Sequence, residues 1–165
     1  MVERREGNQE DLPTRLMTEE TYNILLKRKE EICEELKHLG SKRRGIQQRA
    51  MMHDDAGTAH FENALRAELE MIGNLSSVRL IKPPESVSFV SIGVEVEIEY
   101  NDGRRMTGFL LGPDDAIWLK DKTVISYKSP LGSKIIGKSI GEEVEIKIKH
   151  ELLRVKILNI SKGNF

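Results

Sequence analysis

The chain has 165 residues, enough for one or two domains. Its 26 Lys and Arg residues nearly balance its 27 Asp and Glu residues, and the net charge of −1 excludes a global basic field for nucleic acid or membranes. A single cysteine, Cys33, excludes an internal disulfide framework, and no apolar run reaches the roughly 20 residues that span a bilayer. Because the first residues also lack the apolar stretch of a secretory signal, we expect a soluble, cytoplasmic protein.

The N-terminal half predicts a long helix that follows a polar leader. Residues 1–16 are polar and aperiodic, which predicts a disordered leader. Thr18 followed by two glutamates is typical of a helix start, and the next proline-free stretch predicts a helix of about 35 residues. Apolar residues recur there every seven positions, as on one face of a coiled coil: Leu25, Ile32, Leu39 and Ile46.

A turn and a second helix complete a predicted hairpin over residues 17–80. Residues 53–58 have the composition of a turn, and they form the expected tip. A helix of about 22 residues should follow and fade near Arg79, ahead of two consecutive prolines. Its expected apolar face carries Phe61, Leu65, Leu69, Ile72 and Leu75. Two helices joined by a short turn predict an antiparallel arm that closes its own apolar seam, and hence a monomer.

The pattern changes from helical to alternating in residues 85–162, which predicts a small β domain. Residues 94–100 alternate strictly between apolar and charged, and an Asn-Asp-Gly hairpin turn follows at 101–103. Further strands are expected at 106–111, near 117–119, near 124–127, at 143–149 and at 151–160, with a short helix at about 129–137. The fold class is therefore α+β, with an N-terminal antiparallel α-helical coiled-coil hairpin and a C-terminal antiparallel β domain that has one short helix.

Three motifs make the chain similar to a known family. The first is Ser129-Pro130-Leu131-Gly132, continuing into Ile-Ile-Gly-Lys-Ser-Ile-Gly-Glu-Glu-Val at 135–144. The others are Gly-Pro-Asp-Asp at 112–115 and a Met-Thr-x-x-x-Tyr helix start at 17–22. Over about residues 16–160 the sequence resembles the bacterial transcript cleavage factors, the Gre factors of the GreA/GreB type.

The resemblance implies a fold and a partner. Gre factors place an FKBP-like C-terminal domain at the rim of the RNA polymerase secondary channel, and their coiled coil passes down the channel. It implies that Ser129, Pro130, Leu131 and Gly132 dock on the polymerase. The protein would be no enzyme itself, with no cofactor and no metal of its own. It would help the polymerase, with Mg²⁺ in the polymerase active site, to cleave backtracked RNA near its 3′ end.

The tip departs from the family pattern Gly-Asp-Leu-x-Glu-Asn-Ala-x-Tyr. In one alignment Asp54 takes the place of the family aspartate, Phe61 that of the tyrosine, and Gly57 that of the glutamate. In the other, the glutamate is Glu62 and the aspartate is replaced by Ala59. We favour the first, because it keeps the aromatic residue in place and puts the acids in the predicted turn rather than well along the second helix. Asp55 could then supply a second carboxylate. Asp54 and Asp55 are then the candidate residues that are contributed to the polymerase active site.

One acid of the usual pair is missing in either alignment, so two functions are open. The protein either stimulates cleavage or is a non-cleaving regulator that occupies the channel. A basic stretch near the tip is predicted either to contact RNA or to form a solvated helix face: Lys42, Arg43, Arg44 and Arg49. A peptidyl-prolyl isomerase is a remote third hypothesis, suggested only by the FKBP-like fold, since no aromatic cluster signature accompanies it.

Overall fold

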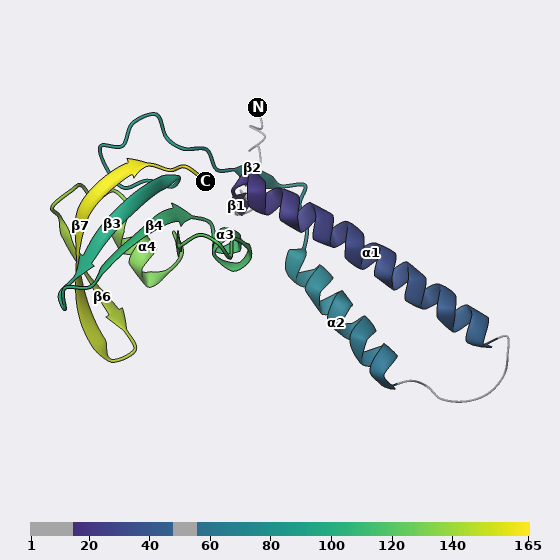
Figure 1. Ribbon diagram of the computed structural model, residues 1–165. Coiled ribbons are helices and arrows are strands. Elements are labelled where there is room, and N and C mark those ends of the chain that lie inside the picture. The colour runs from purple at the N-terminus through teal and green to yellow at the C-terminus, as the bar shows by residue number, and fades with distance from the viewer. Residues whose placement is uncertain (1–14, 48–55) are drawn as a thin grey trace, which may run out of the picture.

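The computed structural model describes residues 15–47 and 56–165, and only the backbone of residues 43–47 and 56. A two-helix arm extends from a C-terminal domain that is built on a curved five-stranded sheet (Figure 1). The predicted α+β class, with a helical hairpin before a small β domain, is confirmed.

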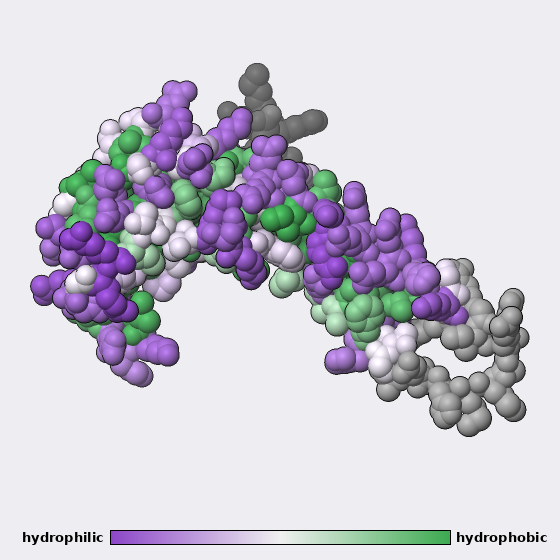
Figure 2. Space-filling view, viewed as in Figure 1, coloured by the Kyte–Doolittle hydropathy of each residue, from purple (hydrophilic) through white to green (hydrophobic). Residues whose placement is uncertain are grey.

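The arm consists of α1 (Glu19–Gln47) and α2 (Ala56–Ile72), which pack along the predicted seam. Leu25 and Ile32 are fully buried on α1, and Leu65 and Ile72 meet them from α2. Figure 2 shows hydrophilic side chains over most of the arm, with apolar groups along the line between the helices. Phe61 was predicted to join the seam, but 49% of it is exposed, so the packed part of the seam lies nearer the sheet domain.

An ion pair across the arm supplements this narrow core. Arg28 on α1 donates from Nε and Nη2 to the two carboxylate oxygens of Glu68 on α2, at 2.7 and 2.8 Å. Two hydrogen bonds in a fork fix the relative rotation of the helices more tightly than a single contact would. The hydrogen bond from Arg28 holds the pKa of Glu68 below its ordinary value of 4.5.

The second helix ends earlier than the sequence predicted, at Ile72 rather than near Arg79. Gly73 adopts a φ of 64°, and its N–H bonds to the carbonyl of Leu69, which closes the helix. The chain then forms β2 (Val78–Leu80), paired in parallel with β1 (Arg15–Met17). Arg15 and Leu16 were assigned to the disordered leader, but they are part of this strand because a segment 63 residues away in register pairs with them.

The sheet contains β3 (Val94–Tyr100), β4 (Arg105–Leu111), β5 (Val124–Ser126), β6 (Glu143–Ile148) and β7 (Glu151–Lys162). Their order across the sheet is β5-β4-β3-β7-β6. The neighbours are antiparallel, with one correction to the prediction: β5 runs parallel to β4. The short helix α4 (Pro130–Ile135) contributes Leu131 and Ile135 to the core on one face of this sheet.

The strand predicted near 117–119 is wrong, because α3 (Pro113–Trp118) occupies most of that segment. Proline at the first helical position and acids in the first turn favour a helix over a strand there. Asp115 is the third residue of this helix, and it is fully buried. Its Oδ2 accepts from the backbone N–H of Gly112 at 2.9 Å, which caps the helix.

The same carboxylate joins the sheet domain to the base of the arm. Asp115 Oδ1 accepts from the backbone N–H of Thr18 at 2.9 Å and from its hydroxyl at 2.7 Å. Beside it, Arg15 donates to both oxygens of Asp114, at 2.8 and 2.7 Å. The joint is tight, since a Cβ added at Gly112 would lie 2.1 Å from the carbonyl oxygen of Leu16.

We expect Asp115→Ala to lower the free energy of unfolding by about 2–4 kcal/mol, measured by urea denaturation. The physical reason is that the buried N–H groups of Thr18 and Gly112 lose their acceptor, as does the Thr18 hydroxyl. Asp121→Ala is the matched control, because Asp121 is exposed. Equal stability of the two variants would contradict a structural role for the buried carboxylate.

We expect the contribution of the Arg28–Glu68 pair to depend on pH. A carboxylate with a lowered folded-state pKa stabilises the fold above its unfolded-state pKa, and the contribution disappears as the pH falls through the folded-state value. Glu68→Gln should therefore cost about 1 kcal/mol or less at pH 7, because the pair is partly exposed, and less at about pH 3, below the ordinary glutamate pKa of 4.5. Urea unfolding at both pH values tests this, with the exposed Glu70→Gln as control; a cost that does not change with pH would contradict it.

Candidate functional site

The tip acids Asp54 and Asp55 lie outside the described residues. Gly57, which stands at the family glutamate position in the favoured alignment, is an exposed residue in the first turn of α2. Glu62 is the acid of the other alignment, and its carboxylate is 2.8 Å from Arg66 Nη2 one turn further along α2. A metal ion would have to compete with that arginine for Glu62.

Most of the predicted basic stretch also lies beyond what the structure describes. Lys42 is exposed on α1, toward the end that leads to the tip. Arg43 and Arg44 belong to α1, but their side chains are outside the described set, as is all of Arg49. Their contact with RNA stays a prediction.

The predicted docking segment, residues 129–132, forms the start of α4. Ser129 is the N-cap, and its Oγ accepts from the backbone N–H of Gly132 at 3.0 Å. Pro130 occupies the first helical position and is exposed, whereas Leu131 packs against the core. These contacts explain structurally why each residue of the Ser-Pro-Leu-Gly motif stands at its position.

Gly132 is the most constrained residue of the segment. It is buried, and a Cβ added to it would lie 2.0 Å from the backbone oxygen of Ser126. The N–H of Ser129 bonds to that same oxygen at 2.9 Å, so the chain turns tightly between β5 and α4. The structure therefore fixes where Pro130 is presented, at the outer side of this turn.

Lys128 precedes the motif at a position where the family often has aspartate. It is exposed, and its Nζ lies 5.9 Å from the centre of the Tyr127 ring, within the range of a cation–π contact. A positive charge therefore lies at the edge of the predicted docking segment.

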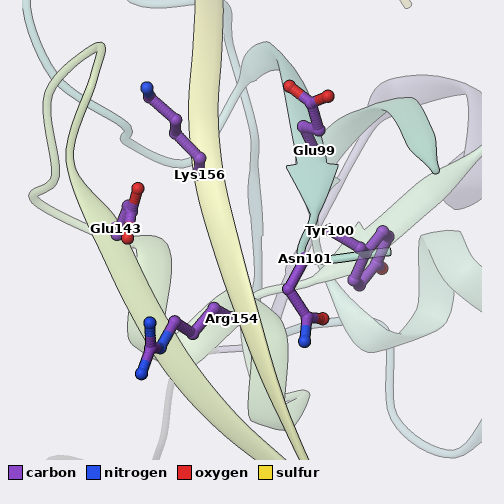
Figure 3. Close-up of a pocket in the computed structure, with 6 residues that line it drawn as sticks. All are labelled: Glu99, Tyr100, Asn101, Glu143, Arg154 and Lys156. Atoms are coloured by element: carbon purple, nitrogen blue, oxygen red, sulfur yellow. The ribbon is translucent and has the colours of Figure 1, made fainter. Parts of the chain in front are cut away.

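A shallow groove of about 250 Å³ lies on the other face of the sheet, across β7 (Figure 3). Figure 3 shows Lys156 and Arg154 on β7, with Glu143 on one side and Glu99 on the other. The charges of these four side chains balance, so the groove offers no surplus charge to an ionic ligand.

Among the described residues, no cluster of three or more His, Cys, Asp or Glu side chains is arranged to hold a metal ion.

Sequence reasoning missed the joint at Asp114 and Asp115, although it noted the Gly-Pro-Asp-Asp run. The available signal was local: proline followed by acids is typical of a helix start. The partners of these acids, Arg15 and Thr18, are 99 and 97 residues away in the sequence, so no local pattern indicates them.

No helix in the described part of the chain is long and apolar enough to cross a bilayer.

Comparison with known proteins finds similarity to one family. Residues 84–162, which contain all five strands of the sheet, match the family model "Transcription elongation factor, GreA/GreB, C-term". The chain is 33% identical over 94 residues to the transcription elongation factor GreA of Thermodesulfovibrio yellowstonii, covering 56% of this chain and 58% of that protein. It is 32% identical over 108 residues to GreA of Nautilia profundicola, covering 63% and 60%.

A shorter stretch has a higher sequence identity. Over 36 residues the chain is 53% identical to GreA of Chloroherpeton thalassium, and this stretch covers 22% of this chain and 23% of that protein. The chain thus spans less than two thirds of the length of these relatives. Among solved structures, Thermus aquaticus Gfh1 superposes with a TM-score of 0.41 at 19% identity, covering 91% of this chain and 99% of Gfh1.

We expect Gly132→Ala to destabilise the sheet domain by about 2 kcal/mol or more, because the new methyl group would meet backbone atoms that cannot move aside. Ser133→Ala, at the exposed neighbouring position, should stay within about 0.5 kcal/mol of the wild type. Thermal or urea unfolding measures both. Similar stabilities for the two variants would show that the turn is not as tight as described.

Proposed function

We propose that this chain is a GreA/GreB-type transcription elongation factor that binds RNA polymerase at the secondary channel. The observation that carries the proposal is the family match over residues 84–162. This match includes the predicted docking segment at 129–132, which the fold holds in a defined turn. In this proposal Pro130 and its surroundings contact the polymerase.

The arm then serves to reach the active centre. α1 has 29 residues, which at 1.5 Å per residue give a length of about 43 Å. The hydrogen bonds of Asp115 with Thr18, and of Arg15 with Asp114, support a fixed direction of the arm relative to the docking domain. A rigid arm can bring its tip to a deep site without the loss of conformational entropy that ordering a flexible arm would cost on binding.

The proposed chemistry belongs to the polymerase, and this protein supplies ligands. Asp54 and Asp55 would help to hold the second Mg²⁺ of the polymerase active site, which binds well through one or two carboxylates and water. Two-metal cleavage of a phosphodiester needs that ion to stabilise the attacking or the leaving oxygen. The protein is therefore proposed to stimulate cleavage without being an enzyme or carrying a cofactor.

The basic stretch would contact the backtracked RNA near its 3′ end. Lys42 is exposed near the tip-ward end of α1, in a position to meet a phosphate backbone in the channel. The three arginines that complete the stretch are proposed to act in the same way: Arg43, Arg44 and Arg49.

A specific observation favours a second candidate function, that of a non-cleaving regulator which occupies the channel. The residue at the family glutamate position is Gly57, so the usual pair of acids is incomplete unless Asp55 compensates. The two candidates share the partner and the docking mode, and they differ only in what the tip does to the RNA.

RNA cleavage in a purified, backtracked elongation complex separates the candidates. We expect the wild-type protein to accelerate cleavage and Asp54→Ala to lose about 10- to 100-fold of that acceleration, since a metal ligand is removed. Gly57→Glu restores the family acid and should increase the acceleration. Lys42→Ala should weaken the effect mainly at low salt, because at high salt the phosphate contact is already screened in the wild type.

The control for this experiment is polymerase binding by each variant, measured in a pull-down. Asp54→Ala should bind as the wild type does, because Asp54 does not belong to the segment that is proposed to dock. If the wild type binds but slows cleavage, and Gly57→Glu accelerates it, the protein is the non-cleaving regulator. If the wild type does not bind polymerase, both candidate functions are wrong.

A further inference from the structure

The charged side chains around α4 are all positive. Residues 128–141 read Lys-Ser-Pro-Leu-Gly-Ser-Lys-Ile-Ile-Gly-Lys-Ser-Ile-Gly, which includes three lysines and no Asp or Glu. The chain as a whole has one more acid than it has Lys and Arg, so this stretch is a local exception. It contains all of α4 and the docking segment at 129–132.

Two of these lysines have no acidic partner within the described part of the chain. Lys138 is 3.3 Å from the carboxylate of Glu142, so its charge is compensated. Lys128 and Lys134 are exposed, and no described carboxylate forms an ion pair with either of them. The ammonium group of Lys128 instead lies 5.9 Å from the centre of the Tyr127 ring. The docking segment is therefore flanked by two uncompensated positive charges.

The geometry of α4 places one of these charges beside Pro130. Residues four positions apart lie on the same side of a helix, so Lys134 follows Pro130 after one turn. The other side of the helix is turned to the core, where Gly132 and Ile135 are buried. In Figure 1 the arm extends away from α4, so neither α1 nor α2 covers the side that carries Pro130 and Lys134.

Exposed apolar side chains accompany the lysines, from the end of α4 and from a loop that is hydrogen-bonded to the segment after it. The N–H of Val90 bonds to the carbonyl of Lys138, and the N–H of Gly137 bonds to the carbonyl of Val90, both at 2.8 Å. Three large side chains of these two segments are between 41% and 55% exposed: Phe89, Ile136 and Ile140. The surface around the docking segment thus combines apolar groups with positive charge.

This combination fits a protein surface better than a nucleic acid. Two lysines would neutralise few phosphates and give a phosphate backbone little binding energy. Exposed apolar side chains gain from burial against other apolar side chains, and protein interfaces typically have an apolar centre and a polar rim. A partner surface with acidic side chains at its rim would complement both features.

We propose that Lys128 and Lys134 determine the specificity of docking, and that the polymerase surface which receives this segment carries acidic side chains opposite them. This inference rests on the proposed function, because it describes the partner of the same docking segment. An aspartate at the position of Lys128, as the family often has, favours a basic partner, whereas lysine favours an acidic one. The chain should therefore discriminate between polymerases by the sign of the charge at that point.

The two lysines act more on the choice of partner than on total affinity. Exposed ion pairs contribute little free energy, but like charges brought together at an interface are costly. The contact of Lys128 with the Tyr127 ring restricts where its ammonium group can lie, which makes the charge more selective. A partner with a basic residue there would meet an unfavourable charge that the segment has no described acid to offset.

The dissociation constant of the full chain with purified core RNA polymerase of the same organism, free of nucleic acid, tests the proposal. At low salt, Lys128→Asp should raise it by about tenfold or more, because the charge is reversed against an acidic surface. Lys128→Ala and Lys134→Ala should each raise it by about two- to fivefold, as expected for one exposed ion pair. These differences should shrink at high salt, where the charges are screened.

Lys147→Asp is the matched control, since it makes the same charge change at an exposed position of β6. Strand alternation turns Lys147 to the sheet face opposite Ile146, which shares the core with Ile135 of α4. This variant should bind polymerase as the wild type does. Circular dichroism should show that every variant is folded.

Cross-linking identifies the chemistry of the partner directly. A carbodiimide joins a lysine amine to a carboxylate in contact with it as an amide, and takes up the water that is lost as a urea. Mass spectrometry of the digested complex should find Lys128 or Lys134 joined to an Asp or Glu of the polymerase. No such product, or equal binding of Lys128→Asp and wild type, would overturn this inference while the proposed function stands. A wild type that does not bind polymerase would instead overturn the proposed function.

Discussion

The buried carboxylate of Asp115 is the contact on which the arrangement of the molecule depends. Burying an ionised group is costly unless its oxygens are hydrogen-bonded. Here Oδ2 accepts from the nearby Gly112, and Oδ1 accepts from Thr18, which is 97 residues away in the sequence. A two-helix arm has a narrow core of its own, and at its base Ile24 also packs against the apolar cluster of Ile81, Leu111 and Leu119. The carboxylate, together with the fork between Arg15 and Asp114, gives the arm a defined base on the sheet domain.

Local patterns predicted those elements whose causes are local. The alternation at 94–100 is β3, with the same bounds, and the seven-residue spacing found the buried Leu25 and Ile32. Where the prediction was wrong, a non-local contact decided. Arg15 and Leu16 are strand residues only because β2 pairs with them, and β5 is parallel to β4 only because α3 carries the chain across between them.

The docking motif shows why a sequence pattern alone does not identify a function. Ser129 caps α4 and Gly132 permits a close turn, so both would be required even if nothing bound there. What remains for recognition is the side chain that the fold leaves outside, above all Pro130. The motif therefore indicates the fold directly, whereas its role in docking rests on the proposal made from the family match.

The order of charges carries more information than their sum. The net charge of −1 conceals an arm held by a fork between Arg28 and Glu68. Because ion pairs at an exposed surface contribute little free energy, their main effect is to choose among otherwise similar arrangements. In the arm they select one rotation of the helices. Near-neutral composition with ordered charges is thus a device for specificity, while burial of the apolar seam and of the sheet core supplies the stability.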